Sequence, residues 1–232
     1  MFRFLRSFLI LYQIALMNVK ILVVWSFLRF FQASSSNIKL RDVGKLFDIS
    51  LYKEFMTFYK IDKISFYKRI LARLSFENYD GRERVIDLVI ISEKGIYSIL
   101  TSDRKGVIKG NCESLQWVEN HDGSHNKFYN PVWFNQTNIE LLADNLGLDK
   151  KYFISVIIFK NKCQLKEIVN MPENVVVVKK DNVKEALEAD FEKRDPMIDK
   201  EEIDLIFDKV KKHVKLQSKL EEEHYKNIEK KY

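Results

Sequence analysis

Two acidic positions near apolar, strand-like segments are the chain's first candidates for chemistry. Asp87 lies within an apolar run, and Asp103 is followed two residues later by Lys105. Residues i and i+2 of a strand face the same side, so a carboxylate and an amine at this spacing can contact one phosphate group. Asp87 has two interpretations, either a functional carboxylate or a strand residue that is hydrogen-bonded to the backbone.

Periodicity predicts the elements that must position these residues. Two strands at residues 84–91 and 96–101 are expected to flank a tight turn that ends at Gly95. Further strands are predicted at residues 66–76, 105–109, 115–119, 152–159 and 175–178, and helices at residues 42–60, 132–146, 183–191 and 199–226. Helices at the two ends with alternating strands between them indicate an α/β sandwich with a mixed sheet.

The order of several short motifs resembles the nuclease-related domain (NERD) family. The motifs are the Asp-bearing segment 84–99, the segment Gly106-Val107-Ile108-Lys109-Gly110, Trp117, the pair Asn130-Pro131 before a helix, and the apolar strand 152–159. The resemblance covers roughly residues 50–215. It implies a restriction-endonuclease-like sandwich, in which helices flank a mixed β-sheet.

The resemblance also implies a chemistry, namely Mg²⁺-dependent phosphodiester hydrolysis. The family places an Asp on one strand and a Glu on the next as metal holders, with a Lys two residues beyond the Glu. Asp87 matches the Asp and is the expected metal ligand, but the Glu and Lys positions hold Leu100 and Ser102. Leucine cannot ligate a metal, and serine cannot replace an ammonium group. Phe134 stands where the family usually has a Gln, and Glu54 matches an upstream family Glu.

Two arrangements could restore a working site. Asp87 could act with Glu54, or with a displaced pair formed by Asp103 and Lys105. A shift of three residues along a strand reverses the side it faces, so the displaced pair requires a bulge or a slipped register. Gly106 and Gly110 keep the spacing from Gly95 that the family shows, which argues against such a slip.

Residues 1–32 form a separate unit that is predicted to be an apolar helix, either spanning a membrane or lying in its interface. Lys20 costs about 2.5–3.5 kcal/mol near the bilayer centre, and thirteen strongly apolar residues return roughly 4–8 kcal/mol. Residues 33–38 are expected to be a linker, residues 39–215 the NERD-like domain, and residues 216–232 a charged helical tail.

Composition leaves several partners open. The net charge of +6 permits binding to nucleic acid or anionic lipid, and the two cysteines are too few for a disulfide framework. The sequence therefore predicts a membrane-held, cytoplasmic NERD-like domain with an inactive nuclease site that needs no cofactor and binds nucleic acid, a protein partner or itself. The alternative is an active Mg²⁺-dependent nuclease.

Overall fold

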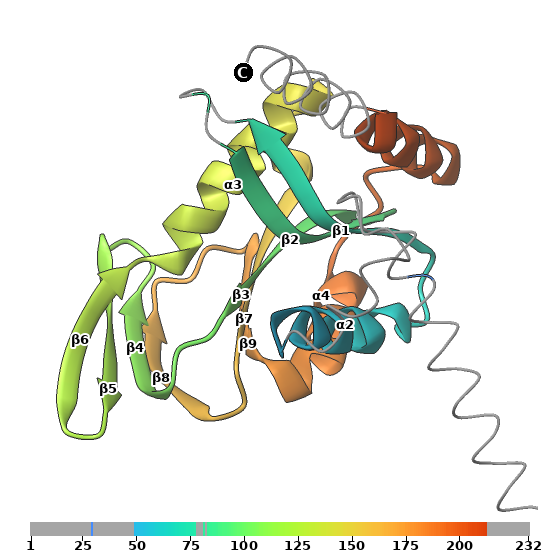
Figure 1. The fold of residues 1–232 in the computed structure, drawn as a ribbon. Coiled ribbons are helices and arrows are strands. Elements are labelled where there is room, and N and C mark those ends of the chain that lie inside the picture. Colours follow the sequence, from blue (N-terminus) through green and yellow to red (C-terminus); the bar gives the residue numbers. More distant parts are fainter. Residues whose placement is uncertain (1–28, 30–48, 78–80, 82, 213–232) are drawn as a thin grey trace, which may run out of the picture.

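A five-stranded mixed sheet is the centre of the molecule (Figure 1). The structure, a computed structural model, describes residue 29 and residues 49–77, 81 and 83–212. The sheet has the order β1-β2-β3-β7-β9, with strands β1 (Lys68–Glu77), β2 (Glu83–Ser92), β3 (Gly95–Ser102), β7 (Phe153–Phe159) and β9 (Val175–Lys179). The first three strands are antiparallel, and β7 and β9 add to β3 in parallel.

A second, four-stranded sheet projects from one end of the first (Figure 1). Its order is β6-β5-β4-β8, formed by β4 (Gly106–Asn111), β5 (Gln116–His121), β6 (Ser124–Tyr129) and β8 (Cys163–Val169). Strands β4, β5 and β6 are antiparallel, while β8 pairs with β4 in parallel. Both sheets are therefore mixed.

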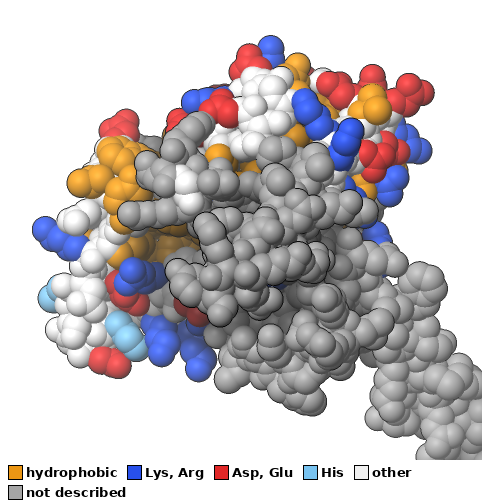
Figure 2. All heavy atoms as spheres, turned by 45° about the horizontal axis from the view of Figure 1, so that its top comes forward, with side chains coloured by type: hydrophobic (Ala, Val, Ile, Leu, Met, Phe, Trp, Pro, Cys, Tyr) orange, Lys and Arg blue, Asp and Glu red, His pale blue; other side chains and the backbone are white. Residues whose placement is uncertain are grey.

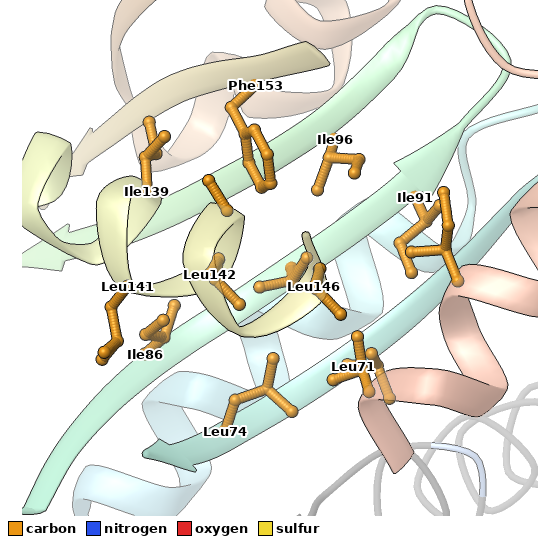
Figure 3. Close-up of a cluster of buried hydrophobic side chains, with 14 of the residues drawn as sticks. Leu71, Leu74, Ile86, Ile91, Ile96, Ile139, Leu141, Leu142, Leu146 and Phe153 are labelled. Carbon is orange, nitrogen blue, oxygen red and sulfur yellow. The ribbon is translucent and has the colours of Figure 1, made fainter. Parts of the chain in front are cut away.

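Helices cover both faces of the five-stranded sheet. On one face, α2 (Ile49–Asp62) and α4 (Val183–Lys193) pack on apolar residues that include Leu88 and Val156. On the other face lie α3 (Pro131–Leu146) and the helix over residues 200–212. Figure 3 shows leucine and isoleucine side chains of α3 pointing onto β1, β2 and β3. Short 3₁₀ turns occupy Lys150–Tyr152 and Lys180–Asn182.

Helix α3 begins and ends as the sequence predicts. The Asn130 side chain accepts a hydrogen bond from the Val132 amide at 2.9 Å, and Pro131 occupies the first turn, where its missing N–H costs nothing. Gly147 ends the helix with φ of 61°, the left-handed conformation that glycine adopts most easily. Asn130 Nδ2 also donates to the Ser114 carbonyl at 2.7 Å, which holds the start of α3 close to the second sheet.

Strands β1 and β2 are irregular at Arg73 and Asp87. Their pairing runs from Ala72↔Leu88 to Leu74↔Ile86, and the two residues between are left out of the register. Arg73 has φ of 51°, which is uncommon for a residue with a side chain. Leu88 packs on the α2 face and Ile86 on the α3 face, although residues two apart in a regular strand share one face. Both strands therefore change sides at this point.

The predicted elements and the observed ones agree in order, with two omissions. Strands β6 and β8 were not predicted, and a tight turn at Asp122 and Gly123 joins β5 to β6. The apolar helix, linker and tail predicted at residues 1–32, 33–38 and 216–232 lie outside the described residues, apart from Arg29. Within the described part of the chain, no helix has the length and apolar character needed to span a membrane.

Candidate active site

A pocket of about 440 Å³ opens at the edge of the five-stranded sheet, around Asp87. Its lining comes from α2, β2, β3, the start of α3 and the segments that follow β7 and β9. The polar members of the lining include Asp87, Asp103, Lys160 and Lys180. Two carboxylates and two lysines thus share one open hollow.

Asp87 is tied to the neighbouring strand by Thr101. The Thr101 amide donates to Asp87 Oδ2 at 2.7 Å, and the Thr101 hydroxyl donates to the same oxygen at 2.6 Å. Burial raises the pKa of Asp87 above its ordinary value of 3.8, even though the Thr101 hydrogen bonds and the charge of Arg73 favour the ionised form. The nearby Asp103 carboxylate also raises the pKa.

Asp103 and Lys160 form an ion pair at the mouth of the pocket. Lys160 Nζ lies 2.5 Å from Asp103 Oδ1, and the lysine side chain is 28% exposed while that of the aspartate is 70% exposed. The Lys160 amide also donates to the Ser102 carbonyl at 3.3 Å, which fixes the end of β7 beside the end of β3. The second carboxylate of the pocket is therefore paired with a lysine.

The three positions at which the chain departs from the family pattern all line this pocket. Leu100 follows Ile99, the β3 residue that pairs with Leu88, and Asp87 precedes Leu88 in β2. Leu100, Ser102 and Phe134 line the same hollow as Asp87. Leu100 and Phe134 make part of the pocket wall apolar, whereas Ser102 contributes a hydroxyl group.

The other predicted site residues are placed differently. Lys105 does not line the pocket, and its backbone amide donates to Glu119 Oε1 at 2.7 Å. Glu54 lies in α2, the helix that contributes Thr57 to the pocket, and its side chain is outside the described residues. Of the displaced pair, the structure therefore brings Asp103 to Asp87 and leaves Lys105 away from it.

Glu119 of β5 holds the segment that carries Asp103. Its Oε2 accepts from Arg104 Nη1 at 3.0 Å, and Oε1 accepts from the Lys105 amide. Burial opposes ionisation of Glu119, but the hydrogen bonds from Lys105 and Arg104 outweigh it and lower the pKa below 4.5. Arg104 also stacks on the Phe128 ring at 4.3 Å. A residue of the second sheet thus fixes one wall of the site.

Buried amides brace the site from behind. Asn135 donates to the Ser98 carbonyl at 2.8 Å and to Ser155 Oγ at 2.9 Å, joining α3 to β3 and β7. Asn138 donates to Asn135 Oδ1 at 3.1 Å and accepts from Arg84 Nε at 2.6 Å. This network links the sheet centre to Arg84 at the pocket's rim.

Lys160 and Lys180 are pocket residues that the sequence analysis did not select. One signal could have found them, since Lys160 directly follows the predicted strand 152–159 and Lys180 lies just beyond the strand at 175–178. Parallel strands end at a common sheet edge, where sites in α/β folds concentrate. The positions of Lys160 and Lys180 after two such strands could therefore have identified them as site residues.

The donor set suits a hard divalent cation held by two carboxylates. Mg²⁺ is usually bound through one or two carboxylates together with waters and substrate phosphate, and Asp87 and Asp103 line a hollow with space for them. Among the described residues, no group of three or more His, Cys, Asp or Glu side chains could hold a metal ion. The residues thus fit a cation shared with a phosphate better than a fully protein-bound one.

The sequence model of the nuclease-related domain (NERD) family matches residues 50–160 of the chain. The matched range begins in α2 and ends just past β7, so it contains Asp87, Asp103 and Lys160. No curated protein and no solved structure matches the chain.

Proposed function

We propose that this pocket binds a nucleic-acid phosphodiester and cleaves it with a divalent cation held by Asp87 and Asp103. The observation that carries the proposal is the presence of Asp103 and Lys160 in the same hollow as Asp87. The match to the NERD family supports a nuclease-related function, and we place the domain in the restriction-endonuclease-like superfamily on the same grounds.

The chain's own residues have separate tasks in this proposal. Thr101 orients the Asp87 carboxylate through two donors. Lys160 holds Asp103 and adds positive charge beside the scissile phosphate, the role that the family gives to a Lys where this chain has Ser102. Lys180, across the pocket, adds a second positive charge for an incoming strand. A bound Mg²⁺ would supply the activation of water and the neutralisation of phosphate charge.

A second candidate is a domain that binds nucleic acid without cleaving it. Leu100 in the pocket lining favours this function, because an apolar side chain fills the position of the family's second acid. In this case the lysines contact phosphate and Asp87 serves mainly to join β2 to β3 through Thr101. Binding that weakens steeply with salt, with no cleavage, would support it.

The test uses the full chain with single- and double-stranded DNA and RNA in Mg²⁺ or Mn²⁺. We expect cleavage by the wild type and its loss by more than about 100-fold in Asp87→Asn and Asp103→Asn, since even groups that only support a metal ligand cost 10- to 100-fold. Asp195→Asn, at an exposed aspartate away from the pocket lining, is the matched control. Equal rates in all four proteins would overturn the proposal.

Stability separates the two interpretations of Asp87. We expect Asp87→Asn to raise the free energy of unfolding by about 0.5–2 kcal/mol at pH 7, because it removes a costly buried charge from a functional site. The amide oxygen can still accept from Thr101. Urea denaturation in EDTA measures the change. A loss of stability would instead mark Asp87 as a structural tie between strands.

We also propose that residues 1–32 attach the domain to a membrane surface or span it, with the domain on the cytoplasmic side. The apolar run and the basic residues around it support this proposal. Fractionation of cells that express the full chain, or a chain that begins at Lys39, tests it. Equal recovery of both proteins in the membrane fraction would contradict it, while crosslinking of the same pair reports self-association.

A further inference from the structure

Three aromatic side chains are exposed beside the pocket. Tyr129 at the end of β6 is 49% exposed, and Trp133 and Phe134 in the first turn of α3 are 38% and 41% exposed. Figure 2 shows hydrophobic side chains gathered on the side of the molecule that carries the second sheet, with Lys and Arg side chains below them. Exposed rings of this size, gathered at one place, indicate a binding surface.

The three rings are held in place. Trp133 Nε1 donates to the Cys112 carbonyl at 2.9 Å, which fixes the indole. Tyr129 and Trp133 pack edge to face with centroids 6.5 Å apart. These contacts orient the rings before any ligand arrives, which lowers the entropy that binding must overcome.

Arg84 connects this surface to the pocket. Its guanidinium lies 4.4 Å from the centroid of the Phe134 ring and donates to the Phe134 carbonyl at 3.2 Å. Phe134 itself lines the pocket, as does the exposed Val85. Phe134 is therefore both one of the three exposed aromatic residues and part of the lining of the hollow that contains Asp87 and Lys160.

This combination of groups suits one class of ligand. Rings stack on the flat faces of bases, whereas arginine and lysine contact phosphates, and the chain carries a net charge of +6. In a duplex the base faces are covered by their neighbours, so only a single strand or an unstacked end can offer them. A purely apolar protein-docking surface would not need the Arg84 charge or continuity with a polar pocket.

We propose that Tyr129, Trp133 and Phe134, with Arg84, form a base-stacking platform that leads single-stranded nucleic acid into the Asp87 pocket. This inference rests on the proposed function and names its substrate class. One base stacks on Phe134 at the rim while the backbone beside it reaches Lys160 and Lys180. The apolar wall formed by Leu100 and Phe134 receives that base.

The test measures binding of the full chain to fluorescent single-stranded and duplex oligonucleotides of equal length, in EDTA so that no cleavage occurs. We expect the single strand to bind at least 10-fold more tightly than the duplex. Phe134→Leu and Tyr129→Leu, which keep apolar bulk and remove the ring, should each weaken single-strand binding by about 5- to 100-fold. Phe134→Tyr should retain it, and Leu205→Ala, at a 69% exposed residue on the helix over 200–212, is the matched control.

Tryptophan fluorescence gives an independent readout. Trp133 is exposed and Trp117 is buried, so stacking of a base should quench emission in the wild type and much less in Trp133→Phe. Equal affinity for single strand and duplex, or unchanged affinity in both ring-deleted variants, would overturn the platform, as would capture of a protein or vesicles by these rings in place of oligonucleotides.

The proposed nuclease function and the proposed base-stacking platform can be disproved independently of each other. If Asp87→Asn abolishes cleavage but the ring-deleted variants bind as the wild type does, the nuclease proposal stands and the platform proposal is wrong. Single-strand binding that depends on the rings, without cleavage in any metal, retains the platform and leaves the binding function.

Discussion

The two sheets of this protein differ in how completely they are buried. Every residue of β7 in the five-stranded sheet is buried, and helices pack on both of its faces. In β6 of the four-stranded sheet, only Phe128 is buried among six residues. The small sheet packs one face on the large one through a cluster around Trp117, which stacks on Phe159 of β7 with centroids 6.2 Å apart.

This contrast shows where the site obtains its parts. The buried sheet supplies Asp87 and the backbone that orients it, while the more exposed sheet supplies Glu119, which holds the Asp103 segment, and Tyr129. Both sheets therefore contribute to the site or to its support, although they differ in burial.

The largest expected effect is a loss of stability that is confined to the four-stranded sheet. Trp117→Ala removes the centre of the small cluster and should destabilise the four-stranded sheet by about 3–5 kcal/mol. Native-state hydrogen exchange should show lost protection in β4, β5 and β6 and retained protection in β2 and β7. Phe153→Ala, in the large sheet's core, is the counterpart and should lower protection in both sheets. Uniform loss in Trp117→Ala would mean that the two sheets unfold as one unit.

A smaller effect is expected from Gly110 in β4. A Cβ there would overlap the indole ring of Trp117, which is buried and cannot move aside easily. Gly110→Ala should therefore cost about 1–3 kcal/mol through overpacking, measured by urea denaturation. Gly123→Ala serves as a control, because a Cβ at Gly123 meets no atom within 4 Å, so its cost comes only from its φ of +75°. A tolerated Gly110→Ala would show that the small cluster is loosely packed.

The smallest expected effect depends on pH and concerns Glu119, which joins strand β5 to the segment that carries Asp103. Glu119 has a lowered pKa in the folded protein, so its stabilisation is complete above the unfolded pKa and is lost as pH falls through the folded value. We expect Glu119→Gln to cost about 1 kcal/mol at pH 7 and progressively less as the pH falls through the folded pKa of Glu119. Unfolding free energies over a series of acidic pH values measure the difference. A cost that does not change with pH would show that shape, and not charge, matters at this position.

Most of the large sheet could be predicted from the sequence, because its strands are rich in β-branched residues and Gly95 lies at the turn between β2 and β3. Gly147 likewise marked the end of helix α3. Strand β6 escaped prediction because four of its residues, Ser-His-Asn-Lys, are exposed and show no apolar alternation. β8 was missed for a similar reason, with several exposed residues.

The site was less readable than the fold. Asp87, Leu100 and Ser102 could be placed from motif order, and the structure puts them around one pocket. The approach of Asp103 depends on two long-range contacts. Glu119 holds the neighbouring Arg104, fifteen residues away in sequence, and Lys160, which follows strand β7, pairs with Asp103. Periodicity along one strand contains no information about such long-range contacts. The same limit explains why Lys105 was paired with Asp103 in the sequence and is held elsewhere in the structure.

Strands β1 and β2 change the face to which their side chains point at Arg73 and Asp87, and this has a practical consequence for placing a spectroscopic probe in the site. The path of the main chain, and not the carboxylate, directs residue 87 into the hollow. A cysteine introduced there would carry its sulfur to the same place, whereas the native thiols at Cys112 and Cys163 are buried. A dye or spin label attached at 87 would then report on whatever enters.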